Sequence, residues 1–149
     1  MTVGKICNRE VVITTPEATL IAVAKLMREY HVGDVVVVNA RGDEKVPVGI
    51  ITDRDIVLAI VASEVDLDAV LAGDIMSHEL LTAGEQESIW DVLQRMRSHG
   101  VRRLPVVNAR GGLEGILSVN DFLELISDEL LALAQVATRQ QQREKEIRK

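Results

Sequence analysis

Two four-residue segments of the chain combine a hydroxyl group with a carboxylate three residues later. They are Thr52-Asp53-Arg54-Asp55 and Ser118-Val119-Asn120-Asp121, and each follows an apolar run that begins with Gly-Ile. A hydroxyl can donate a hydrogen bond to a phosphate oxygen, and a carboxylate can accept bonds from two adjacent ribose hydroxyls. Arg54, Arg102 and Arg103 could add charge-assisted bonds to a phosphate. These residue types in this spacing favour contacts to a sugar phosphate.

A helix N-terminus at each segment would add a further attraction for an anion. We expect a strand that ends at Ile51 and a helix that starts near Thr52, which leaves backbone N–H groups and the positive end of a helix dipole at that edge. The same spacing also describes a plain N-cap with an acidic residue in the first turn, which needs no ligand. Duplication would copy a cap as readily as a ligand contact, so both interpretations stay open.

The elements that must position these segments occur twice. An offset of 69 residues places Ile6 on Ile75 and Val32 on Val101, and the run Val-Val-Asn-Ala-Arg-Gly at 37–42 recurs identically at 106–111. The offset then falls to 66, which places Gly49 on Gly115 and Asp55 on Asp121. The first copy is therefore three residues longer in the turn at 43–48, where a repeated fold tolerates a change of length.

Each copy predicts a helix, two strands and a second helix in the same order. The first helices are expected over 20–30 and 89–99, and the second helices begin at Thr52 and Ser118. Capping residues flank the first helices: Thr19 and Ser88 before them, Asp91 as the capping-box partner of Ser88, and Gly33 and Gly100 near their ends. The short apolar strands are expected over 35–38, 48–51, 104–107 and 113–117.

The C-terminal part of the chain predicts one long amphipathic helix. Apolar residues recur at helical spacing from Asp121 onward, at Phe122, Leu125, Ile126, Leu130, Leu133, Ala134 and Ala137. Beyond Thr138 the chain is polar with mixed charges, which is typical of an exposed helix, a frayed end or a helix-pairing segment.

Composition and charge exclude several classes of function. The chain has 149 residues, 47% of them hydrophobic but only 2% aromatic, with a formal charge of −6. An acidic chain lacks the lysine and arginine surface that nonspecific nucleic-acid binding needs. We therefore expect no nucleic-acid partner. We expect no membrane partner either, because the longest apolar run, 56–62, is far shorter than the ~20 residues of a membrane span. A lone cysteine and the absence of signal-peptide features favour a cytoplasmic protein.

The remaining reactive residues favour structural roles. No Cys/His cluster has the spacing of a metal site, no nucleophile and base pair is evident, and no glycine-rich phosphate loop is present. We therefore expect no metal, no catalytic residue and no catalytic cofactor. Cys7 fits a small apolar role, and Trp90 and Met96 fit packing or dimer contacts on an amphipathic helix.

The repeat resembles a known family once its motifs are read together. The segment "DIMSHELLTAGEQESIWDVLQRMRSHGVRRLPVVNARGGLEGILSVNDFLELI" looks like a complete CBS domain, and "GIITDRDIV" is the similar ending of the first copy. The resemblance covers about residues 3 to 127. It implies a Bateman module: two pseudo-twofold-related βαββα units, clefts that often hold AMP, ATP or related adenosyl ligands, and frequent assembly into a dimer.

The resemblance also indicates where an adenosyl ligand would lie. Adenine is expected near Thr14 and Val35 in one site, and near Thr82, Leu104 and Pro105 in the other. The two sites are not equal, because the second motif has Asn120 where the first has Arg54. Asp34, where the second copy has Arg103, would repel a phosphate.

These observations predict an α/β (α+β) protein of two tandem CBS units with a long C-terminal helix. The expected divisions are 1–66, 67–130 and a tail of 131–149. The expected function is a regulatory sensor of AMP, ADP or ATP, or else of NAD or S-adenosylmethionine, that acts as a homodimer on a protein target. A ligand-free dimerisation scaffold is the alternative, and a nucleotide-processing enzyme is the least supported hypothesis.

Overall fold

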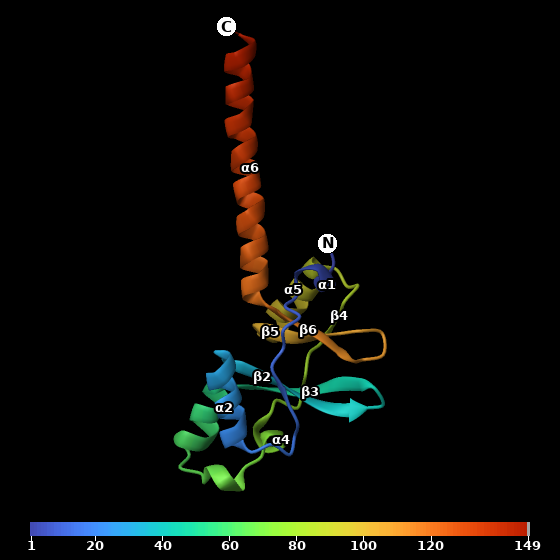
Figure 1. The fold of residues 1–149 in the computed structure, drawn as a ribbon, viewed down its shortest axis with the longest axis vertical. Helices are drawn as coiled ribbons and strands as arrows, with labels where there is room; N and C mark the ends of the chain where they lie inside the picture. Colours follow the sequence, from blue (N-terminus) through green and yellow to red (C-terminus); the bar gives the residue numbers. More distant parts are fainter. Residues whose placement is uncertain (149) are drawn as a thin grey trace.

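Two similar units and one long helix make up the chain, as Figure 1 shows for the computed structural model, which describes residues 1–148. Residues 1–69 form α1 (Val3–Ile6), β1 (Ile13–Thr14), α2 (Leu20–Tyr30), β2 (Asp34–Arg41), β3 (Glu44–Thr52), α3 (Asp53–Ile56), the π-helical turn η1 (Val57–Val61) and the 3₁₀ turn η2 (Leu67–Ala69). The rest forms α4 (Ala72–Ile75), β4 (Ala83–Gly84), α5 (Ile89–His99), β5 (Arg103–Val107), β6 (Leu113–Ser118) and α6 (Val119–Ile147). The mixed α+β fold with a long C-terminal helix is as the sequence predicted.

Each unit contains one three-stranded sheet with the same topology. The strand orders are β1-β2-β3 and β4-β5-β6, with the first pair parallel and the second antiparallel in both sheets. A short parallel strand followed by a helix and a hairpin therefore occurs twice. This repetition is the structural counterpart of the sequence offset.

The short helices that lead each repeat are exchanged between the units. Val3 of α1 is fully buried in the core of the second unit, among Ile89, Val92 and Leu104. Ala72 of α4 is fully buried in the core of the first unit, beside Leu20. Val3 and Ala72 occupy equivalent positions of the two repeats, 69 residues apart. The exchange is therefore reciprocal, and each unit completes its core with a segment from the other repeat.

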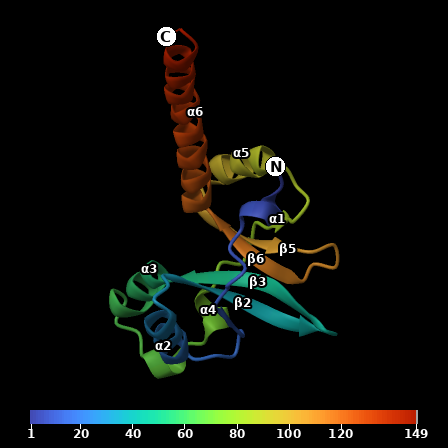
Figure 2. The ribbon, with the colours of Figure 1, turned by 45° about the horizontal axis from the view of Figure 1, so that its top comes forward.

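A third cluster of apolar side chains joins the two sheets. Val36, Val38 and Ile50 from the first sheet pack against Leu113 and Ile116 from the second. Figure 2 shows the two sheets lying next to each other, with α2 and α3 at one end of the body and α5 and α6 at the other. The units are thus joined along their sheets, and the helices lie on the outside.

The predicted first helices are confirmed, but their caps differ in detail. Thr19 caps α2 as expected, because its side chain accepts a hydrogen bond from the N–H of Ala22 at 3.2 Å. Ser88 makes no side-chain cap bond, so the predicted capping box with Asp91 is wrong. The physical reason is that the chain's own N-terminal segment occupies this end, where the Ile89 N–H donates to the Met1 carbonyl at 3.3 Å.

The C-terminal ends of these helices also differ between the copies. Gly100 ends α5 in the left-handed conformation that a glycine adopts without strain. In the first copy His31, rather than Gly33, takes this conformation, with a φ of 54°. The helix ends at Tyr30 as expected, but the residue that terminates it is His31 and not Gly33.

The long helix α6 leaves the body near its own N-terminus. Phe122 is buried in the second core, whereas every described residue of α6 from Ile126 onward is exposed. Within residues 1–148 no helix combines the length and the apolar content that a membrane span requires.

Candidate functional site

A cleft of about 520 Å³ collects the first predicted motif and the arginines of the second repeat. We call it the first cleft. Its lining comes from the end of β3, from α3, from the segment before β4 and from the start of β5: Ile50, Thr52, Asp53, Arg54, Asp55, Ser77, Glu79, Leu80, Leu81, Gly100, Val101, Arg102 and Arg103. Residues from both units are therefore needed to form it.

Thr52 and Asp55 hold each other in a reciprocal capping box. The Thr52 N–H donates to Asp55 Oδ2 at 2.8 Å, and the Asp55 N–H donates to Thr52 Oγ1 at 3.1 Å. Asp53 Oδ1 accepts a hydrogen bond from the Arg54 N–H at 2.8 Å. The cap interpretation of the motif is correct, and the box leaves the Thr52 hydroxyl proton and Asp55 Oδ1 available to a ligand.

The basic side of the first cleft is partly neutralised by an acid from the first unit. Asp34 and Arg103 stand at the same repeat position, 69 residues apart, and form a hydrogen-bonded ion pair between the units. Asp34 lies opposite Thr52 in the β2–β3 register, and Arg103 lies opposite Ser118 in the β5–β6 register. The pair thus lies between the two motifs, and it leaves Arg54 and Arg102 as the arginines of this cleft without a salt bridge among the described residues.

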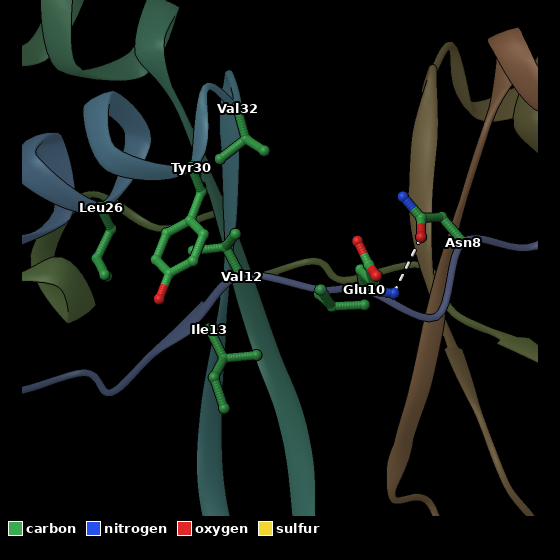
Figure 3. A pocket seen from close by; sticks show the side chains of 8 residues that line it. Asn8, Glu10, Val12, Ile13, Leu26, Tyr30 and Val32 are labelled. Atoms are coloured by element: carbon green, nitrogen blue, oxygen red, sulfur yellow. Dashed lines mark hydrogen bonds between the residues drawn. The ribbon is translucent and has the colours of Figure 1, made fainter.

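A second cleft of about 610 Å³ lies between α2 and the segment 8–13 (Figure 3). Leu26 and Tyr30 reach into it from α2, and Asn8 borders it beside the second sheet. The complete lining is Asn8, Glu10, Val11, Val12, Ile13, Leu26, Tyr30 and Val32.

The two clefts are built from matching repeat positions. Adding 69 to Asn8, Glu10, Val11, Val12 and Val32 gives Ser77, Glu79, Leu80, Leu81 and Val101, all of which line the first cleft. Asn8 pairs with Ile116 of β6, two residues before Ser118, as Ser77 bonds to Ile50, two residues before Thr52. The second cleft therefore lies beside the second motif.

The second motif also caps its helix. The N–H and the hydroxyl of Ser118 both donate to Asp121 Oδ2, at 2.6 and 2.8 Å. Ser118, Asn120 and Asp121 are not among the residues that line the second cleft. In contrast to Thr52, the Ser118 hydroxyl already uses its proton within the box.

The residues expected around adenine lie in the sheets. Val35 and Leu104 have no exposed surface, and Pro105 is buried as well. Thr14 and Thr82 are partly exposed, and the Thr82 carbonyl accepts a hydrogen bond from Arg95 at 3.0 Å. None of these five residues lines either cleft, so the structure does not bring the expected adenine contacts together with the motif residues.

Sequence reasoning missed the two segments that follow α1 and α4. Asn8–Ile13 and Ser77–Leu81 each line a cleft, and each lies between an exchanged helix and a short first strand. The repeat offset contained this signal, because these segments are aligned by it. The strand that each segment crosses depends on the exchange of α1 and α4 between the units. The repeat offset alone does not predict that exchange.

The arginine beside the second cleft is engaged elsewhere. Arg9 donates to Glu85 at 2.7 Å and to the Gly4 carbonyl at 2.9 Å, and the bond to Glu85 raises the pKa of Arg9. Burial raises the pKa of the neighbouring Cys7 thiol, against the opposing effect of Arg9. Among residues 1–148, no arginine or lysine lines the second cleft.

Comparison with known proteins places these features in a family context. The family model described as CBS domain matches residues 3–62 and 72–128. An uncharacterized protein of Methanopyrus kandleri is 37% identical over 125 residues, which cover 84% of this chain and 62% of that protein. The chain therefore spans less than two thirds of the length of this relative.

Two further proteins are similar over most of their own length. Hypoxic response protein 1 of Mycobacterium tuberculosis is 32% identical over 81% of this chain and 82% of that protein, and a structure of Hypoxic Response Protein I holds two zinc ions. A CBS domain protein from Pyrobaculum aerophilum, solved with AMP, is 31% identical over 85% of this chain and 99% of that chain, with a TM-score of 0.73. In residues 1–148 of the present chain no three His, Cys, Asp or Glu side chains gather as a metal site would need.

Proposed function

The chain belongs to the CBS domain family, and from that premise we propose that it is a regulatory module that binds an adenine nucleotide in the first cleft. The observation that carries the proposal is the meeting of Thr52, Asp55, Arg54 and Arg102 in one cleft formed by both units. The Pyrobaculum relative with AMP supports an adenosyl ligand.

The chemistry of the first cleft suits a ribose with a phosphate beside it. The Thr52 hydroxyl and the two arginines, which have no salt bridge among the described residues, offer donors to phosphate oxygens. Asp55 Oδ1 offers an acceptor to ribose hydroxyls, and the capping box holds this carboxylate in place. We therefore favour AMP, ADP or ATP over an adenosyl ligand without phosphate.

The second cleft is proposed to bind phosphate more weakly. Glu10 lines it and, in the part of the chain that the structure describes, no basic side chain does. The Ser118 hydroxyl is already used by Asp121. Tyr30 and Leu26 give it an apolar wall. We expect one tight and one weak nucleotide site in each chain.

Regulation would follow from the position of the first cleft between the units. A ligand that contacts Thr52 in one unit and Arg102 in the other favours the arrangement that brings them together. We propose that a homodimer transmits this change to a protein target, without catalysis by the chain itself.

The test is a binding and melting panel on protein freed of carried-over ligand. A nucleotide at 100 times its Kd should stabilise the fold by ~2.7 kcal/mol. Asp55→Asn keeps an oxygen for the Thr52 N–H but loses the charge, so we expect it to weaken nucleotide binding about 10- to 100-fold. Asp121→Asn is the matched control and should leave the tight site unchanged.

A ligand-free dimerisation scaffold is the second candidate. It is favoured by the hydrogen bonds within the two motifs, a reciprocal box between Thr52 and Asp55 and two bonds from Ser118 to Asp121, which form without any ligand. It predicts no melting shift with any nucleotide and equal behaviour of the two asparagine variants. That result would overturn the nucleotide proposal.

A further inference from the structure

An apolar seam runs along the exposed part of α6. Leu123, Ile126, Leu130, Leu133 and Ala137 follow one another at alternating steps of three and four residues, which is the spacing of a coiled-coil interface. All five are exposed, with 62% of Leu130 and 67% of Leu133 accessible. A helix face of this kind is normally covered by another helix.

The side chains of α6 from Ile126 onward remain exposed within residues 1–148. Residues 126–147 extend about 33 Å at 1.5 Å per residue, away from both sheets (Figure 1). A single helix of this length is only marginally stable in water without tertiary packing. Its leucine seam therefore needs a partner.

The seam continues into a groove on the body. Met1, Ile89 and Trp90 line the groove together with Ile126, Leu130 and Leu133 of the seam. The groove has a volume of about 420 Å³, and half of the Trp90 surface is exposed there. Seam and groove thus form one continuous apolar surface.

The charges of α6 point to a second copy as the partner. Residues 119–133 contain four acidic residues and no basic one, whereas residues 134–148 contain four basic and two acidic residues. Two copies that run antiparallel place the acidic half of each helix beside the basic half of the other. A parallel pair would place like charges together.

We propose that α6 pairs antiparallel with α6 of a second copy of this chain through the seam. When the crossing is centred between Leu130 and Leu133, Leu130 faces Leu133 of the second copy and Ile126 faces its Ala137. The polar end of the second helix then runs toward the groove and covers Trp90. This inference specifies the surface of the homodimer in the proposed function, on which it rests.

Sedimentation velocity on the full chain tests the pairing. The wild type should form a dimer, and Leu130→Glu and Leu133→Glu should each weaken it ~100-fold or more, because each buries a charge in the seam. Leu131→Glu is the matched control: Leu131 is 59% exposed, lies one position away from the seam and does not line the groove. A monomeric wild type, or equal effects of all three variants, would overturn the proposal.

Trp90 gives a second readout from the same samples, since it is the only tryptophan. Its emission should shift to the blue as the dimer forms, and Leu130→Glu should abolish this shift. An emission maximum that is independent of protein concentration while the dimer forms would contradict the coverage of the groove.

Disulfide trapping tests the direction of the pair. In a Cys7→Ala background, a mixture of Ile126→Cys and Ala137→Cys chains should form a mixed disulfide, whereas Ala137→Cys alone should not. A disulfide from Ala137→Cys alone would overturn the antiparallel arrangement. Calorimetry with ATP on these samples separates the two proposals. A monomeric protein that binds ATP would contradict only the pairing of α6. A dimeric protein that fails to bind ATP would contradict only the nucleotide site.

Discussion

Asp34 and Arg103 set the charge of the first cleft. The sequence suggested that Asp34 would repel a phosphate, and that Arg103 would attract one. The structure joins them in an ion pair between the units, so the two effects are coupled. A nucleotide phosphate and Asp34 would compete for one guanidinium group.

Removal of the Asp34 charge should therefore strengthen nucleotide binding. We expect Asp34→Asn to bind ATP about 3- to 10-fold more tightly, because Arg103 becomes free to contact phosphate. In an Arg103→Gln background the same change should give no gain. Titration calorimetry of the wild type, the two single variants and the double variant measures the coupling between Asp34 and Arg103. An equal gain in both backgrounds would contradict it.

The thiol of Cys7 offers a test of burial by pH. Because desolvation raises its pKa, the folded protein should hold less thiolate at a given pH than a free cysteine does. Its alkylation by iodoacetamide should have a pH midpoint above that of the urea-unfolded chain. The midpoint should fall to the ordinary value when the chain unfolds, and equal midpoints in both states would show that the thiol is not buried.

Among the elements, β3 and β6 carry a close contact with the exchanged segments. A Cβ on Gly115 would lie 2.8 Å from both the Asn8 carbonyl oxygen and Cys7 Sγ. A Cβ on Gly49 would lie 2.7 Å from Met76 Sδ. These two glycines occupy the same repeat position, and both allow a crossing segment to approach the strand.

Neither glycine should tolerate alanine. Gly115→Ala meets the Asn8 carbonyl oxygen, and Gly49→Ala meets Met76 Cβ at 2.8 Å, an atom that is fixed to the backbone. We expect each change to cost about 2–3 kcal/mol in unfolding free energy. Gly84→Ala, whose Cβ would have ordinary contacts, is the control. Urea titrations compare the three variants, and a cost at 49 or 115 no larger than the cost at 84 would contradict the close approach of the crossing segments.

The spacing of apolar residues and the positions of capping residues and glycines predicted helices and strands well where local interactions determine them. The bounds of α2 and α5 were obtained because their apolar spacing and caps are local features. The cap predicted at Ser88 is wrong because a distant segment, at Met1, occupies that end. Likewise, motif spacing indicated Thr52 and Asp55, but Glu10 and Tyr30 in the second cleft depend on contacts between residues far apart in the chain.

For the whole molecule, the exchange of α1 and α4 bears on the proposed divisions 1–66 and 67–130. A chain cut at residue 66 would lose Ala72 from the first core, and the second core would lose Val3. The third cluster between the sheets adds a further shared core. We therefore expect the two units to fold as one cooperative body, although the sequence divides into two repeats.

Unfolding seen by one probe in each unit should be a single transition. The only tyrosine, Tyr30, lies in the first unit and the only tryptophan, Trp90, in the second. Because tryptophan dominates the fluorescence, the wild type reports the second unit, and a Tyr30→Trp, Trp90→Phe variant reports the first. Val3→Ala removes two methyl groups from the second core and should cost about 2 kcal/mol. Because the units are coupled, this change should move the urea midpoints of both probes equally. A shift of the Trp90 transition alone would mean that the repeats unfold independently, and that the exchanged helices contribute little to the coupling between the units.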